Sequence, residues 1–196
     1  MKILILGCGR MGLSHLLQLS SLQRDVDTEF HIVDPSILSR AMAYFFLKQR
    51  KLRFISRSHA MKLPPDSYDF AVDASPPFER VENISLLTRL AGYSLIEKPV
   101  TTGLDSSKAM SGYVLQHGPL IDKLLNEVRG ACDPVDMVIA KVKTNLTFDG
   151  EGWRSGGHRA VVSEFMGHLL SVSFLLRDPQ SKPVIKRVFT GERSVA

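Results

Sequence analysis

Three glycines, Gly7, Gly9 and Gly12, lie within the stretch GCGRMG, directly after the apolar run ILIL at positions 3–6. An apolar run without polar alternation is typical of a buried parallel strand. Glycine after such a strand allows a tight turn, a close approach of the backbone to a pyrophosphate, and close packing of a helix on the strand. The chemistry that this spacing indicates is phosphate binding, although a glycine-rich turn without a ligand would have the same sequence.

The segment after the turn has helical spacing, because leucines recur three residues apart in it. These leucines are Leu13, Leu16, Leu19 and Leu22. The last glycine of the turn is then expected at a helix start, which presents unpaired backbone N–H groups and the positive end of the helix dipole to an anion. Arg10 and Met11, between the glycines, are further candidate contacts for a dinucleotide.

A carboxylate follows the next expected strand, TEFHIVD, which ends at Asp34. Asp34 lies about 20 residues beyond the glycine turn, where an acid can accept hydrogen bonds from the ribose hydroxyls of an adenosine. A carboxylate there would repel a 2′-phosphate, which favours NAD over NADP. NADP stays open, because Arg40, one turn into the following helix, could reach such a phosphate. Asp34 is equally suited to be the N-cap of that helix, and the two roles are compatible.

Strands and helices alternate along the first half of the chain. Strands are expected at 3–6, 28–34, 53–57, 68–77 and 93–99, and helices at 10–22, 36–52 and 78–92. This alternation predicts an α/β fold with a doubly wound parallel sheet and right-handed crossovers. Ligands of such sheets bind beyond the carboxyl ends of the strands. Two polar stretches fall at these ends: ASPP, with Ser75, Pro76 and Pro77, and EKP, with Glu97 and Lys98.

The order of several short motifs resembles that of the Gfo/Idh/MocA oxidoreductases. EKP follows the fifth strand as in that family, GCGRMG matches its first turn, and ASPP is similar to its Thr-Pro-Pro loop beside the nicotinamide. GYVLQHGPLIDKLLNEV resembles the start of the family's second domain, and GWRSGGHRAVVSEFMGHLL resembles its Gly-Gly helix with an acid and a histidine four residues apart. The resemblance extends over most of the chain. It implies a dinucleotide-binding domain at 1–110 and a smaller, incomplete α+β substrate or oligomerisation domain at 111–196.

In that family the lysine of Glu-Lys-Pro hydrogen-bonds the reacting hydroxyl, and a histidine acts as general acid and base. By resemblance these residues are Lys98 and His168, with Glu164 as the acid four residues before the histidine. A histidine titrates near neutral pH, and an ammonium suits the charge that develops on an alcohol oxygen. The implied function is NAD(P)-dependent hydride transfer to or from a polyhydroxylated small molecule, such as a sugar or cyclitol. A helix-face histidine without a ligand and a solvated loop lysine are the alternatives.

Departures from the family pattern favour another function. Glu164 stands where the family has aspartate, and Arg80 stands three residues after the Pro-Pro pair, where the family often has histidine. About a dozen residues separate Pro99 from GYVLQ, too few for a full crossover helix and a strand. The rival is a non-catalytic dinucleotide-binding protein, a regulatory or partner subunit without the substrate sheet. Within the enzyme class, reduction of a non-sugar C=O, C=N or C=C bond also stays open.

Composition excludes several other classes. The net charge of +5 comes with no nucleic-acid motif, and the densest basic run, at 48–53, is expected to close a helix, where the dipole favours cations. No apolar stretch is long enough to span a membrane, no signal peptide is expected, and two cysteines suit a reducing cytoplasm. The histidines lack metal-ligand spacing, so no metal site is predicted. An incomplete second sheet would expose apolar surface, which predicts a homo-oligomer joined through residues after about 135.

Overall fold

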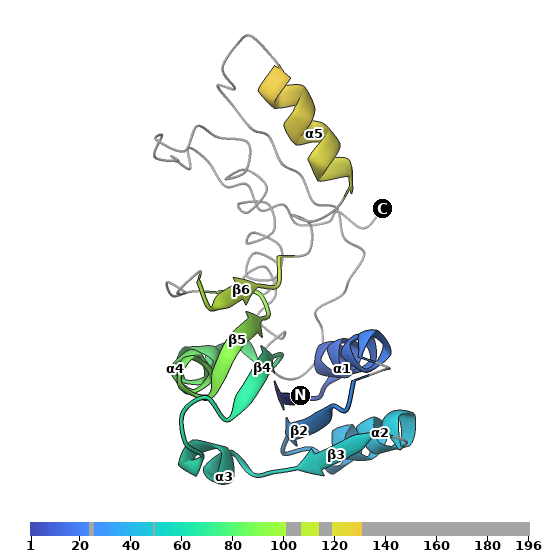
Figure 1. Ribbon diagram of the computed structural model, residues 1–196, viewed down its shortest axis with the longest axis vertical. Coiled ribbons are helices and arrows are strands. Elements are labelled where there is room, and N and C mark those ends of the chain that lie inside the picture. The colour runs from blue at the N-terminus through green and yellow to red at the C-terminus, as the bar shows by residue number, and fades with distance from the viewer. Residues whose placement is uncertain (24–25, 49, 101–106, 114–118, 131–196) are drawn as a thin grey trace, which may run out of the picture. The chain divides into compact units, whose positions relative to one another are not determined.

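The computed structural model describes residues 1–23, 26–48, 50–100, 107–113 and 119–130. The chain divides into two units, Met1–Gly112 and Tyr113–Ala196. The first unit holds a sheet flanked by helices, and the second contributes helix α5 (Pro119–Gly130) (Figure 1). The predicted α+β domain at 111–196 lies mostly outside the described residues, so its fold and its part in a homo-oligomer stay predictions.

In the part of the chain that the structure describes, six parallel strands form one sheet in the order β3-β2-β1-β4-β5-β6. The strands are β1 (Lys2–Leu6), β2 (Glu29–Val33), β3 (Lys51–Phe54), β4 (Tyr68–Asp73), β5 (Ala91–Ile96) and β6 (Ala109–Ser111). In the register, Ile5 of β1 pairs with Ile32 of β2 and Val72 of β4. The predicted doubly wound α/β sheet is confirmed, and β6 extends it within the shortened interval after Pro99.

The helices of this unit are α1 (Arg10–Leu22), α2 (Ile37–Leu47), α3 (Arg57–Lys62) and α4 (Arg80–Leu90), with a 3-10 turn at Pro77–Glu79. Serine side chains cap two of them. Ser36 Oγ accepts the backbone N–H of Ser39 at 3.2 Å, and Ser56 Oγ accepts that of His59 at 3.1 Å. The cap at Ser56 helps to explain α3, which the sequence pattern does not predict because six residues are too few to show an apolar period.

The basic run 48–53 does not close a helix, contrary to the prediction. Helix α2, described along its whole length, ends at Leu47 with no basic residue in its last turn. Lys51 and Arg53 belong to the edge strand β3 and pair with acids: Lys51 Nζ lies 2.7 Å from Asp27, and Arg53 Nε lies 2.5 Å from Glu29. Charged residues on an edge strand disfavour pairing with another chain, and Lys51 and Arg53 are suited to this role.

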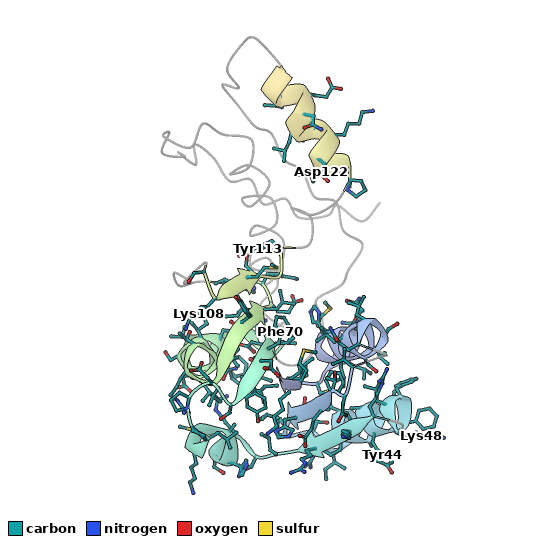
Figure 2. All side chains as sticks on the ribbon, viewed as in Figure 1. Tyr44, Lys48, Phe70, Lys108, Tyr113 and Asp122 are labelled. Carbon is teal, nitrogen blue, oxygen red and sulfur yellow. The ribbon has the colours of Figure 1, made fainter. Side chains whose placement is uncertain are left out.

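Alternate residues of β1 face opposite sides of the sheet. Ile5 packs in a cluster with Leu16 of α1, and Leu4 packs in another with Leu87 of α4. All four side chains are fully buried, whereas Tyr44, on the outer side of α2, is exposed (Figure 2). Because helices cover both faces, the ends of the strands are where a ligand can meet the sheet.

None of the described helices has the length and the apolar character that a membrane crossing requires. Among the same residues, no three His, Cys, Asp or Glu side chains are grouped so that they could hold a metal ion. Cys8, the described cysteine, is buried and carries a free thiol.

Candidate functional site

Within the described residues, four turns line one edge of the sheet, beyond the carboxyl ends of neighbouring parallel strands. The glycine turn (7–12) follows β1, and the turn at 34–36 follows β2. The loop 74–77 (ASPP) follows β4, and the loop 97–99 (EKP) follows β5. Because the strands are ordered β2-β1-β4-β5, the turns follow one another in the same order. We call this row the carboxyl edge.

Two of the three glycines leave no room for a side chain. Gly7 has a φ of 77°, and an added Cβ would lie 2.7 Å from the backbone nitrogen of Ser75. At Gly12 an added Cβ would collide with the carbonyl oxygen of Gly7. These approaches hold the turn against the loop after β4 and seat α1 on the turn, as the glycine pattern predicts.

Gly9 differs, since nothing lies within 4 Å of the position that its Cβ would take. It is the N-cap of α1, and no side chain caps the helix there. The helix begins at Arg10, so Gly12 lies inside the first turn rather than at the start. The first bond within the helix runs from the N–H of Leu13 to the carbonyl of Gly9 at 2.8 Å, so the preceding N–H groups, including that of Met11, have no acceptor within the helix. An uncapped helix start beside open space fits a phosphate.

Asp34 is fixed by two backbone N–H groups. Its Oδ2 accepts from Cys8 at 2.5 Å, and its Oδ1 accepts from Ser36 at 2.7 Å. The first bond ties the carboxylate to the glycine turn, and each oxygen keeps acceptor capacity for ligand hydroxyls. The N-cap of α2 is Ser36, so the alternative interpretation of Asp34 as the cap is wrong. Burial and, to a smaller extent, the charge of Asp34 raise the pKa of the Cys8 thiol to about 11, which keeps it protonated at neutral pH.

Ser75 in the loop 74–77 belongs to a buried polar cluster that no sequence motif indicates. Asp73 Oδ1 accepts the backbone N–H of Ser75 at 3.0 Å and its hydroxyl at 2.5 Å. Asn83 of α4 donates to the Ser75 hydroxyl oxygen at 2.8 Å. The hydroxyl is thereby engaged inside the protein, whereas Ala74, Pro76 and Pro77 of the same loop are half-buried.

Glu97 in the loop 97–99 is almost fully buried and hydrogen-bonds His15 of α1, with 2.7 Å between Oε1 and Nε2. Its other oxygen accepts the backbone N–H of Lys98 at 3.3 Å. Burial, the largest effect, raises the pKa of Glu97, but the bonds and charges of His15 and Lys98 outweigh it and hold the pKa below its ordinary value. His15 was missed, although it lies three residues after Gly12 on the same side of α1, which was the available signal.

The candidate catalytic residues are only partly described. Lys98 lies directly after Glu97, at the end of β5, and is half-buried. His168 and Glu164 lie outside the described residues. Their convergence on Lys98 therefore stays a prediction.

The fold has relatives among solved structures. The chain is similar to a crystal structure of scyllo-inositol dehydrogenase from Lactobacillus casei with bound NAD(H) and scyllo-inositol, with a TM-score of 0.50 and 16% identity. A crystal structure of the apo form gives a TM-score of 0.49 and 14% identity. Each match covers 65% of this chain and 40% of the other, and at such identities the likeness shows the fold alone. No family model and no curated protein matches the sequence.

Replacement of Gly9 tests whether the glycine turn binds a pyrophosphate. Gly9→Ala places a methyl group in open space, so the fold should survive while phosphate approach is hindered. We expect NADH binding to weaken about tenfold, as for loss of one hydrogen bond to a charged group, and to weaken further in Gly9→Val.

The matched control is Gly92→Ala. Gly92 lies near the start of β5, at the other end of the strand, and its Cβ would make ordinary contact with Asp69 at 3.5 Å. Fluorescence titration with NADH measures the affinities. Equal affinity in wild type and both Gly9 variants would show that the motif is only a turn.

The Glu97 carboxylate predicts a pH-dependent part of the stability. Because its pKa is lower in the folded protein, ionised Glu97 contributes stability that is complete above the ordinary glutamate pKa of about 4.3 and is lost as the pH falls through the lowered value. We expect Glu97→Gln to lower the free energy of unfolding by about 1.5–3 kcal/mol near neutral pH and by less in acid.

Urea unfolding in buffers from neutral to acidic pH measures this difference. Glu82→Gln is the control, because the Glu82 side chain is 81% exposed, and it should change little at any pH. A difference between wild type and Glu97→Gln that stays constant into acid would contradict the role of the ionised carboxylate.

Proposed function

We propose that the chain binds NAD(H) at its carboxyl edge and transfers a hydride between that cofactor and a polyhydroxylated small molecule. The observation that carries the proposal is the joint geometry of the glycine turn and Asp34. An uncapped helix start with open space at Gly9 suits a pyrophosphate, and the N–H of Cys8 fixes an acid beside it. An anion site next to a fixed carboxylate suits a ligand with phosphates and neighbouring hydroxyls.

In this proposal the two halves of the dinucleotide lie toward opposite ends of the carboxyl edge. Asp34 follows β2, on one side of β1, and is suited to the ribose of the adenosine. The loops 74–77 and 97–99 follow β4 and β5, on the other side of β1. With the pyrophosphate at the glycine turn, the nicotinamide half extends toward these two loops.

NAD supplies a hydride acceptor when bound. Residues of the chain must then accept the hydroxyl proton of the alcohol and stabilise the charge on its oxygen. The ammonium of Lys98 suits the negative charge that develops on that oxygen. By the motif resemblance, His168 takes the hydroxyl proton and Glu164 orients its ring. The sugar- or cyclitol-like substrate class rests on the same resemblance and on the scyllo-inositol in the similar structure.

A second candidate function is that of a non-catalytic dinucleotide-binding protein, a regulatory or partner subunit. Glu164 favours it, because it is one methylene longer than the aspartate of the family pattern and could misplace His168. Such a protein would bind NAD(H) at the same carboxyl edge and would show no turnover.

We expect Asp34→Asn to shift cofactor preference from NADH toward NADPH. The amide has one acceptor oxygen, so it keeps one of the two backbone bonds of Asp34, and it removes the charge that repels a 2′-phosphate. The ratio of the NADPH Kd to the NADH Kd should fall about tenfold or more, as for loss of a charged hydrogen bond. Asp69→Asn is a matched control, because Asp69 also accepts a backbone N–H from β1, that of Lys2, at 2.7 Å. An unchanged ratio in Asp34→Asn would contradict the contact between Asp34 and the ribose of the adenosine.

Turnover tests the catalytic half of the proposal. The wild type is given NAD and a panel of polyols and cyclitols, and reduction is followed at the nicotinamide absorbance. We expect His168→Ala to lower kcat by about a hundredfold to ten-thousandfold while NADH affinity stays unchanged. Lys98→Met should slow the same step, and the double variant should lose less than the two losses combined.

His59→Ala is the control for this experiment, since His59 is an exposed histidine of α3. Unchanged kcat in His168→Ala would contradict its role as acid and base. NADH binding without turnover on any compound of the panel would favour the non-catalytic candidate.

A further inference from the structure

Arg80 connects the two loops at the nicotinamide end of the carboxyl edge. It is the first residue of α4 and, although charged, it is only 5% exposed. Its Nη1 donates to the carbonyl oxygen of Pro99 at 3.0 Å, and its Nη2 donates to the carbonyl oxygen of Ser75 at 2.9 Å. One guanidinium therefore bonds the loop after β4 and the loop after β5.

The geometry of this bridge is suited to fixing the distance between the loops 74–77 and 97–99. A guanidinium presents its N–H groups in a rigid plane, so the positions of its two acceptors are set relative to each other. Ser75 is held from its other side by Asp73, and Pro99 directly follows Lys98. A shift of the Pro99 carbonyl would therefore move Lys98 relative to the loop 74–77.

Burial of the charge argues against a role in packing alone. A buried guanidinium is unfavourable unless its N–H groups are bonded, and an apolar side chain could fill the same space at lower cost. A neutral histidine, which the family pattern often has here, carries one N–H donor and could not donate to both carbonyls.

We infer that Arg80 is a positioning residue, which sets the separation of the loops 74–77 and 97–99 and so the place of Lys98 beside the nicotinamide. The inference rests on the proposed function. It concerns the nicotinamide half of the ligand, because both carbonyls to which Arg80 donates, those of Ser75 and Pro99, belong to the loops after β4 and β5.

ADP-ribose separates this role from general destabilisation, because it has the pyrophosphate and the adenosine of NADH and lacks the nicotinamide. The wild type should bind NADH more tightly than ADP-ribose. Arg80→Lys keeps the charge and loses the rigid fork. It should weaken NADH binding about tenfold and change ADP-ribose binding by about twofold at most.

The matched control is Arg89→Lys. Arg89 lies on the same helix, and its guanidinium also donates to two backbone carbonyls, those of Leu63 and Met61. These carbonyls precede β4, away from the carboxyl edge. Arg89→Lys should therefore lower the free energy of unfolding and leave the ratio of NADH to ADP-ribose affinity unchanged.

If Arg80→Lys does not fold, the wild type provides the test through the guanidinium N–H signals of Arg80 in an NMR spectrum. These signals should shift with NADH and stay in place with ADP-ribose. Equal affinity of the wild type for both ligands, an equal loss of both affinities in Arg80→Lys, or unshifted signals would overturn the inference. A wild type that binds neither ligand contradicts the proposed function itself, and the inference falls with it.

Discussion

The seating of helix α1 on strand β1 at Gly7 and Gly12 is the constraint on which the candidate site depends. A Cβ at Gly12 would collide with the carbonyl oxygen of Gly7, so this approach requires glycine. It brings the start of α1 to the end of β1, where the turn meets Asp34 from β2. It also places His15, one turn along the helix, 2.7 Å from Glu97 after β5. One close contact thus supports the turns on both sides of β1.

Charged side chains join the turns of the carboxyl edge to one another. Asp34 holds the glycine turn, Glu97 holds α1, and Arg80 holds the loops after β4 and β5. Hydrogen bonds with a charged partner are short and directional, so they fix geometry more strictly than apolar packing does. Fixed geometry before the ligand arrives is what binding and transition-state stabilisation both require. The same residues therefore contribute to folding stability and to the candidate site.

The features that the sequence predicts are those encoded by local spacing. The apolar strands, the glycine turn and Asp34 are predicted from residues that are close to one another in the chain. In the structure the glycine turn and Asp34 meet at the carboxyl edge. The spacing of His15 from Gly12 indicates its side of the helix, but its bond to Glu97 could not be predicted, because the two residues lie 82 positions apart and only the fold joins them. Arg80 departs from a family pattern, but its two acceptors could not be predicted, because they lie in separate loops that only the fold brings together.

Errors in the predicted elements have a similar cause. Helix α2 was predicted to continue to residue 52, because cations suit a helix end as well as they suit the edge strand β3 that follows. Helix α3 and strand β6 are too short for a hydrophobic period to show.

The central claim is that the carboxyl edge binds a dinucleotide, with its adenosine over β2 and its nicotinamide over β4 and β5. Backbone-amide NMR with ADP-ribose and then with NADH tests this claim most directly. We expect ADP-ribose to shift the amide signals of residues 7–12, Asp34 and Ser36, and NADH to shift those of residues 74–75, 78–80 and 96–98 in addition. Identical shifts with both ligands, or no shift along this edge, would contradict the claim.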